Sequence, residues 1–258
     1  MQVNRKVSKL GCAIALAAGL VMVPNAYAEM TSNIGVVSKY ILRGQTFPRA
    51  PLPPGPDAVR PDATPSESDG PAVQGGVDYS HASGFYAGYW GSSLSYGNDA
   101  NTGFENDFYG GYGGKVGDIG YSAGLVQYYY LNIDNSNALE VDASLSFGPV
   151  KGGMRYLASD VAWGNTGDIY WTLGYSTKFL EHFTFATTLG YYTYEESGKF
   201  IPTSTKSSAF RHLDISLSHP IAATGADMIL TYVKGGESRD GTDLKDGITL
   251  GVKFGFSM

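Results

Sequence analysis

The chain has little of what defines several common protein classes. Among its 258 residues there is one cysteine, Cys12, so a scaffold held together by disulfides is excluded. Charged residues make up only 16%, against roughly a quarter in an ordinary soluble domain. The formal net charge of −6 argues against a nucleic-acid-binding protein, which would carry a basic surface.

Long apolar runs are also missing. The longest one extends from Leu10 to Val23 and covers about 14 residues, whereas a membrane-spanning helix needs roughly 20. A helical membrane protein is therefore excluded. Disorder is excluded because aromatic residues reach 13% and the net charge is modest. What the chain does contain, 35 glycines and 19 tyrosines, favours an all-β protein.

The first 28 residues have the composition of an export signal. Three basic residues precede the apolar run, and a small-x-small cleavage site ends at Ala28. We therefore predict a signal peptide over residues 1–28, which places residues 29–258 beyond the inner membrane. A lipoprotein anchor at Cys12 is disfavoured, because the apolar run follows this cysteine instead of preceding it.

The rest of the chain alternates between apolar and polar residues. Residues 139–148 show the pattern clearly, and residues 248–258 repeat it up to the end of the chain. A period of two is typical of β-strands with one apolar face. Because a single such window arises easily by chance, its recurrence along the whole chain carries the argument.

We predict twelve strands, with ten or fourteen as alternatives. Their ranges are 33–43, 72–81, 85–96, 104–115, 119–130, 138–148, 150–159, 168–179, 183–194, 210–219, 226–234 and 247–258. Segments 210–219 and 226–234 are the least regular. The connections alternate between long and short, which is the layout of an outer-membrane barrel, and an even strand number puts both termini on the periplasmic side.

A soluble β-sandwich would show the same alternation, but three features favour a single transmembrane antiparallel β-barrel. The polar face is rich in glycine, as a crowded lumen requires. The alternation continues to the last residue. Aromatic residues collect near both ends of the apolar face, as two membrane-interface girdles would: Tyr40, Tyr96, Phe104 and Tyr129 near the long loops, and Tyr86, Phe147, Phe179, Phe183 and Phe254 near the short turns.

Residues 44–71 interrupt the pattern. They hold eight of the twelve prolines, and proline cannot continue a hydrogen-bonded ladder. We therefore predict a long Pro-rich external loop. Loops of this length are usually functional or disordered, so the segment is either a flexible acidic loop or a constriction folded over the pore mouth.

Three motifs resemble a known family. The run SNIGVVSKYILRGQTF at 32–47 contains an aromatic-x-x-Arg-Gly step at 40–44, and it is followed by Gln-Gly-Gly at 74–76 and by Gly-Phe-Tyr-Ala-Gly-Tyr-Trp at 84–90. These resemble the opening strands of the TorF porin family. The resemblance implies an outer-membrane location and a channel role, and it adds neither a solute nor a catalytic residue. Residues 44–71 depart from it, because family members usually have a shorter loop there.

The polar face of the strands gives the predicted lumen wall. Its acids are Asp78, Glu105, Asp107, Glu140, Asp142, Asp214 and Asp227, and its bases are Lys39, Arg43, Lys115, Lys151, Arg155, Lys178 and Lys253. From these we predict eight pore-lining residues: Glu105, Asp107, Lys115, Glu140, Asp142, Lys151, Arg155 and Lys178. Equal numbers of both signs argue against strong ion selectivity. The excess of acids in the loops predicts a weak cation preference at the mouth.

One cross-strand pair can be predicted. If Gly148 and Pro149 form a two-residue turn, Asp142 lies opposite Arg155 on the lumen side, and a slip of one residue would invert every face. Such a pair is either a charged constriction or, in the favoured interpretation, a salt bridge that neutralises two charges.

An enzymatic function is disfavoured. The compact candidate is His212, Asp214 and Ser216 on one strand face, but same-face neighbours lie roughly 7 Å apart, too far for a nucleophile and its base. No Gly-x-Ser-x-Gly motif and no metal-ligand spacing occurs. We predict no enzyme, no cofactor and no metal.

The sequence therefore predicts a porin-like channel in the outer membrane of a Gram-negative bacterium. It would contact outer-membrane lipids and allow passive diffusion of small hydrophilic solutes, through a lumen narrowed by inward tyrosines such as Tyr109, Tyr128, Tyr170 and Tyr192. The alternative is a non-conducting barrel that acts as a structural protein, adhesin or receptor through its external loops. A water path through the lumen would favour the channel, and a packed interior would favour the alternative. The oligomeric state stays open.

Overall fold

The computed structural model describes residues 28–45, 70–95 and 103–257. The expected signal peptide, most of the Pro-rich loop 44–71 and Tyr96 lie outside these ranges. Among the described residues no helix has the length and the apolar character needed to cross a bilayer.

The described residues form twelve strands and one short 3₁₀ helix. The strands are β1 (Glu29–Val37), β2 (Ala72–Ser80), β3 (Phe85–Ser93), β4 (Phe104–Val116), β5 (Ile119–Leu131), β6 (Ala138–Phe147), β7 (Val150–Leu157), β8 (Ile169–Phe179), β9 (Phe183–Thr193), β10 (Ser208–Pro220), β11 (Ala226–Gly235) and β12 (Gly247–Ser257). The helix η1 (Ala222–Thr224) lies in the turn before β11.

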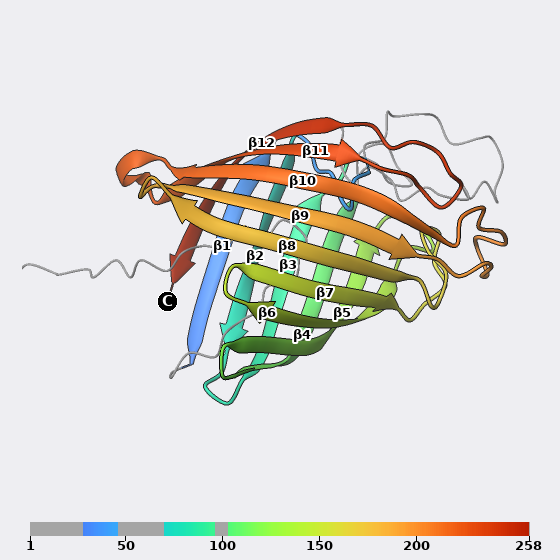
Figure 1. Ribbon diagram of the computed structural model, residues 1–258, viewed down its shortest axis with the longest axis horizontal. Helices are drawn as coiled ribbons and strands as arrows, with labels where there is room; N and C mark the ends of the chain where they lie inside the picture. The colour runs from blue at the N-terminus through green and yellow to red at the C-terminus, as the bar shows by residue number, and fades with distance from the viewer. Residues whose placement is uncertain (1–27, 46–69, 96–102, 258) are drawn as a thin grey trace, which may run out of the picture.

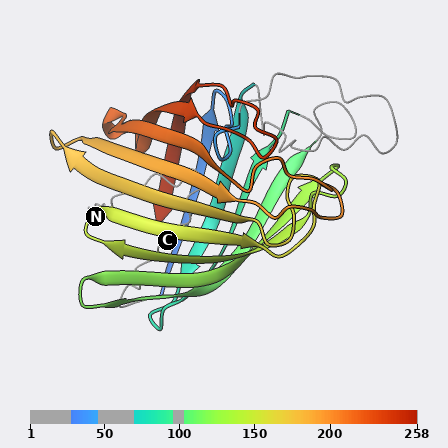
Figure 2. The same cartoon turned by 45° about the vertical axis from the view of Figure 1, so that its right-hand side comes forward.

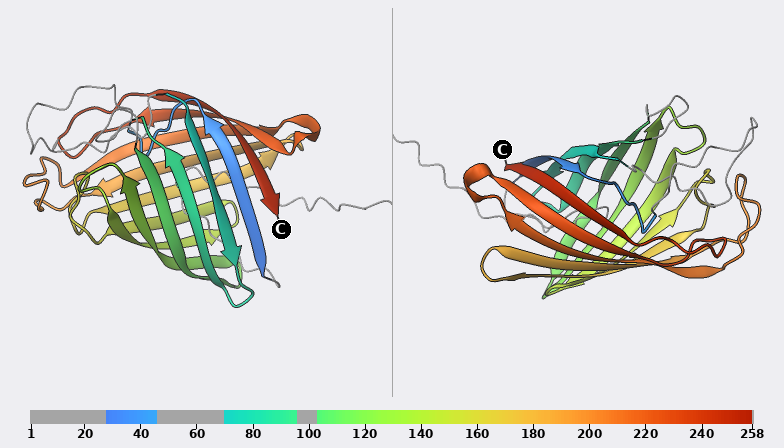
Figure 3. Two further views of the ribbon diagram at one scale, coloured as in Figure 1. Left: turned by 180° about the vertical axis from the view of Figure 1, so that it is seen from behind. Right: turned by 90° about the horizontal axis from the view of Figure 1, so that it is seen from above.

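The strands close into one barrel. Each strand pairs antiparallel with its neighbours in the chain, and β1 pairs with β12 to complete the ring. Figure 1 shows the long loops gathered at one end and the short turns at the other, and Figure 2 shows the same division from a second side. In Figure 3 the blue β1 lies beside the red β12, where the ring closes. The predicted closed antiparallel barrel of twelve strands is confirmed.

The surface of the barrel has the inverse polarity of a soluble protein. Its outward side chains are large and apolar; Phe147, for example, is 64% exposed. Its interior holds carboxylates, guanidinium groups and hydroxyls, and Glu140 is 1% exposed. An apolar outer band around a polar interior is typical of barrels that span the outer membrane. A soluble sandwich, whose core would be apolar, is thereby excluded.

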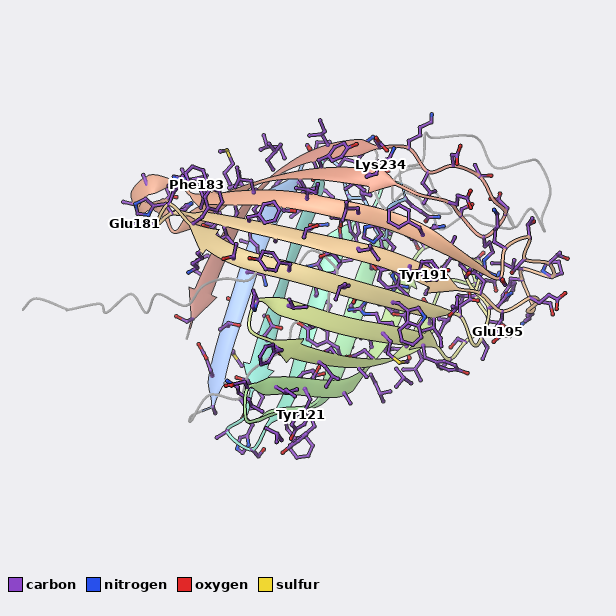
Figure 4. The ribbon with its side chains drawn as sticks, in the orientation of Figure 1. Tyr121, Glu181, Phe183, Tyr191, Glu195 and Lys234 are labelled. Carbon is purple, nitrogen blue, oxygen red and sulfur yellow. The ribbon has the colours of Figure 1, made fainter. Side chains whose placement is uncertain are left out.

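The aromatic girdles are present in part. Tyr129, Phe147, Phe179 and Phe254 are exposed on the outer face as predicted, and Figure 4 shows Phe183 near the short turns and Tyr191 toward the long loops. For two residues the prediction was wrong. Tyr40 is only 3% exposed, because the chain after β1 turns inward. The hydroxyl of Tyr86 lies against the inner glycines Gly111 and Gly124, because Tyr86 occupies an inward position of β3.

The strand boundaries agree with the alternation everywhere except at the start. The first strand was predicted over 33–43 but runs from Glu29 to Val37. After Val37 the chain leaves the sheet, and Arg43 and Gly44 adopt positive φ angles of 51° and 77°. Such left-handed residues cannot continue a strand, so the alternation in 38–43 belongs to a different structure.

The predicted register between β6 and β7 is confirmed. Asp142 pairs with Arg155 and Phe147 with Val150 across the turn at Gly148. The favoured salt bridge between Asp142 and Arg155 was wrong, because the guanidinium group of Arg155 turns to Tyr128 and Glu140 instead. Gly148 has a φ of 55°, which a two-residue hairpin turn requires and glycine adopts without strain.

A β-bulge accounts for the irregularity expected in 210–219. The pairing of β10 with β9 shifts between Phe210 and His212, so that Arg211 is an extra residue. A bulge changes the direction of side chains locally. Here Arg211 and His212 are consecutive and yet both buried.

Candidate functional site

The site is built around residues 38–45, which we call the inward segment. It follows β1 at the long-loop end, visible as the blue loop in Figure 2, and closes on itself through a bridge between Leu42 and Gln45. Tyr40, Leu42, Arg43 and Gln45 are all buried. The chain therefore folds back into one end of its own barrel.

Arg43 fastens the inward segment to the opposite wall. Its guanidinium group donates from Nη1 and Nη2 to the two carboxylate oxygens of Glu140 on β6, at 2.9 and 2.8 Å. Nη1 also donates to the hydroxyl of Tyr192 at 2.5 Å, and Nη2 to that of Tyr128 at 3.3 Å. A bidentate pair of this kind fixes both the orientation of the guanidinium group and its distance from the carboxylate.

Aromatic rings enclose the same guanidinium group. Its Cζ lies 4.6 Å from the ring centre of Tyr170 on β8 and 6.0 Å from that of Trp163. A cation over an aromatic face is stabilised by the ring quadrupole. In the ring of twelve strands β6 and β7 lie opposite the closure between β1 and β12, so Arg43 reaches across the lumen.

Arg155 adds a second guanidinium group to this cluster. It donates to the hydroxyl of Tyr128 at 2.7 Å and lies 3.8 Å from Glu140, whereas Tyr128 donates to Glu140 at 2.8 Å. Two cations and one tyrosine thus surround a single buried carboxylate. We call Arg43, Tyr128, Glu140, Arg155 and Tyr192 the Arg43 cluster.

Gly44 allows the inward segment to touch β10. A Cβ atom at this position would lie 2.5 Å from the Cβ of His212 and 2.7 Å from the carbonyl oxygen of Arg211. Arg211 in turn donates from Nε to the carbonyl oxygen of Arg43 at 3.1 Å. The Arg-Gly step is therefore needed for close backbone approach as well as for its left-handed conformation.

An apolar cluster seals the space beside the charges. Tyr40 and Leu42 of the inward segment belong to a buried group that also includes Tyr130, Leu157 and Val161. The ring of Tyr40 meets Trp90 of β3 edge to face, with centroids 5.8 Å apart. The outer half of the lumen is thus packed like a protein core.

The hydrolase candidate does not assemble. Nδ1 of His212 lies 2.7 Å from Asp214, so our expectation that same-face neighbours are too far apart was wrong for these two: the strand is regular from His212 onward, and the two side chains lean toward each other. Nε2 of His212 is bonded to the hydroxyl of Tyr170 at 2.6 Å, whereas Ser216 is bonded to Thr231 at 2.8 Å. The serine therefore has no histidine base in this geometry. The described residues also contain no cluster of His, Cys, Asp and Glu able to hold a metal ion.

Three long loops pack together at the mouth. Arg239 pairs with the buried carboxylate of Asp168 and lies 4.7 Å from the ring of Tyr194. The side chain of Asn165 donates to the carbonyl oxygen of Ile201 at 3.2 Å. The backbone N–H of Thr166, which donates to Asp160 at 2.8 Å, holds the pKa of that carboxyl below its usual range. These contacts join the loops after β7, β9 and β11.

The eight predicted pore residues occupy three different environments. Glu105 and Glu140 are fully buried in the outer half, and Glu105 accepts a hydrogen bond from Tyr130 at 2.9 Å. Lys115 and Lys178 are exposed near the short turns. The others are half-buried on inward strand positions: Asp107, Asp142, Lys151 and Arg155.

The structure therefore brings Glu140 and Arg155 together but leaves the two terminal lysines apart. The sequence predicted Arg43 as a residue of the barrel wall and did not predict its contact with the opposite wall. It gave no indication that Trp163 and Arg211 belong to the site. The one available signal was the Arg-Gly step at the end of the first alternating segment.

The inner half of the lumen is lined differently. Here Ser122 is bonded to Ser144 at 2.9 Å, and Tyr109 lies over Gly88 and donates to Asp78. Serine and glycine thus share this part of the wall with the inward rings of Tyr86 and Tyr109.

Comparison with known protein families identifies the family of this chain. A family model described as "Bacterial protein of unknown function (Gcw_chp)" matches residues 64–244. The chain belongs to this family. No curated protein sequence matches the chain.

Solved structures show the same fold. The "KdgM porin" has a TM-score of 0.53 at 11% identity, covering 88% of this chain and 99% of the porin. The "KdgM porin in complex with disordered oligogalacturonate" has a TM-score of 0.50 at 10% identity, with the same coverage. At this identity the likeness of this member of the Gcw_chp family to KdgM concerns the fold alone.

Proposed function

We propose that the protein is a narrow porin-like channel for passive diffusion of small hydrophilic solutes across the outer membrane of a Gram-negative bacterium. The observation that carries the proposal is the closed barrel with apolar residues outside and ionised groups inside. A bilayer stabilises such an outer surface, and ionised groups inside provide a polar route.

Two further observations support it. The fold is that of the KdgM porin, one structure of which was obtained with an oligogalacturonate. The motifs at 40–44, 74–76 and 84–90 resemble the TorF porin family. Our proposal therefore includes that this protein is a member of the TorF family. Export would rely on a signal peptide over residues 1–28.

The inward segment is then the constriction of the channel. The Arg43 cluster crosses the lumen and the apolar cluster fills the space beside it, so passage depends on the width left there. Because acids and bases are equally numerous on the predicted lumen wall, we expect weak ion selectivity, with a slight cation preference at the mouth from the acidic loops.

A specific observation favours a second candidate, a non-conducting barrel that acts through its external loops. The outer half of the lumen is packed by the inward segment, as a closed plug would be. The two functions differ in whether ions cross the intact barrel.

Single-channel recording in planar bilayers separates the two. Refolded residues 29–258 are compared with the variant Glu140→Gln, which weakens the hold on Arg43, and with Glu181→Gln in an exposed short turn (Figure 4) as control. We expect small steps for the wild type and the control, and larger steps for Glu140→Gln. Folded barrels that all remain silent would establish the non-conducting alternative.

A further inference from the structure

A second space lies in the lumen, on the wall from which the inward segment departs. It is a cavity of about 50 Å³ between β1, β2, β3, β11 and β12. Its inner surface includes Asn33, Gln74, Trp90, Thr231, Thr249 and Lys253. We call it the neutral cavity.

The lining is suited to hydroxyl groups. Asn33 and Gln74 carry amides, and Thr231 and Thr249 carry hydroxyls, so each side chain both donates and accepts hydrogen bonds. Some of them are held in place. The amide of Gln74 donates to Ser92 at 3.3 Å, and the hydroxyl of Thr231 is bonded to Ser216 at 2.8 Å. Alcohols, which also donate and accept, match this set.

The charges of the lumen do not favour an ion here. Lys253 is the one charged side chain in the lining, and Asp227 lies directly opposite it in the strand register. The buried charges of the Arg43 cluster lie on the far wall and pair with each other. An ionic solute would lose part of its hydration here and would meet a lysine whose charge is offset by the carboxylate facing it across the strands, whereas a neutral solute avoids that loss.

The size of the cavity limits the solute. One water needs about 10–15 Å³ of such volume, so 50 Å³ corresponds to about four waters, or a small polyol. Trp90 borders the cavity and is held from behind by the edge contact with Tyr40. Its ring offers an apolar surface for C–H groups. Gly35 and Gly251 keep the adjoining wall free of side chains.

We propose that the neutral cavity is a binding subsite for small uncharged polyols, which the channel would carry in preference to ions of similar size. The proposal rests on the proposed function for the route of the solute, but binding itself does not require conduction.

Saturation-transfer NMR on the refolded full barrel in detergent micelles tests it, with erythritol as probe and sodium threonate as the anion of similar size. We expect saturable erythritol binding in the millimolar range and at least tenfold weaker threonate binding. Gly251→Leu should abolish the signal, because a Cβ here meets no atom closer than 3.4 Å and the side chain would fill the cavity. Asn33→Ala should weaken binding about threefold, from loss of one hydrogen bond.

The matched control is Ser176→Leu, an exposed residue on β8 on another part of the wall. It adds the same side chain outside the neutral cavity and should leave binding unchanged. Circular dichroism and heat-dependent gel mobility verify that each variant is folded.

The outcomes distinguish the two proposals. Erythritol binding without any conductance would retain the subsite and overturn the channel. Conductance without saturable erythritol binding, binding of threonate equal to that of erythritol, or binding unaffected by Gly251→Leu in a folded barrel would each overturn the subsite.

Discussion

The two halves of the lumen are built from the same twelve strands and yet differ in kind. The outer half is filled by the inward segment, large aromatic rings and paired charges. The inner half is lined by serine and glycine together with the inward rings of Tyr86 and Tyr109, and the neutral cavity lies on the wall from which the inward segment departs. Strand number sets the width of a barrel, but here the side chains and one short segment decide how much of that width remains.

The charges in the two halves follow different rules. In the outer half Glu140 is removed from water and must be matched by Arg43 and Arg155, because a buried unpaired charge is costly. In the inner half Lys115 and Lys178 remain exposed to solvent and need no partner. Perturbing the outer half should therefore change both stability and conductance, and perturbing the inner half should change neither by much.

The largest effect is expected from Arg43→Met. It leaves Glu140 buried with only Arg155 nearby, which costs about 3–5 kcal/mol, and it releases the inward segment. Urea unfolding in micelles should show the loss, and planar bilayers should show larger steps. The double variant Arg43→Met with Glu140→Gln removes the unpaired charge and should recover about half of the lost stability. No recovery would mean that Glu140 is not the partner that matters.

Gly44→Ala comes next. The left-handed φ of 77° and the overlap with β10 should together destabilise the barrel by about 2–3 kcal/mol. Gly117→Ala is the matched control, since Gly117 has a φ of 59° in a short turn with no atom within 4 Å. It should cost about 1 kcal/mol. Equal losses in thermal unfolding would show that backbone approach to β10 contributes nothing.

Ser144→Ala tests the difference between the two halves by a change in the inner half. It removes one hydrogen bond to Ser122 in a region with space for water, so we expect a loss of less than about 1 kcal/mol and unchanged conductance. A clear change in conductance would place part of the constriction in the inner half.

The smallest effect concerns pH at the mouth. The hydrogen bond from Thr166 lowers the pKa of Asp160, so the carboxylate stabilises its loop above the usual carboxyl pKa and loses this effect as the pH falls through the lowered pKa. Hydrogen exchange of the Thr166 amide should therefore be slower in wild type than in Asp160→Ala at neutral pH. The difference should shrink in acid, and a constant difference would contradict the assignment.

The sequence was most informative where structure is local. Alternation predicted the strands, and the two residues Gly148 and Pro149 were enough to predict the β6–β7 register. It failed where contacts are distant or the pattern is interrupted. Arg43 and Glu140 are 97 positions apart, and alternation continues past Val37 although the chain has already left the sheet. The bulge at Arg211 inserts one extra residue into the strand. In the alternation of apolar and polar residues such an insertion is visible only as an irregularity.

The closure between β1 and β12 has a consequence for assembly. The ring joins the first strand to the last, so it cannot close until the final strand has arrived. The inward segment, attached to the first strand, contacts β6, β8, β9 and β10, all of which precede β12 in the chain. It can therefore bind the middle strands of the sheet before the ring closes. The same segment that narrows the finished barrel then also serves as a core around which the strands curve during assembly.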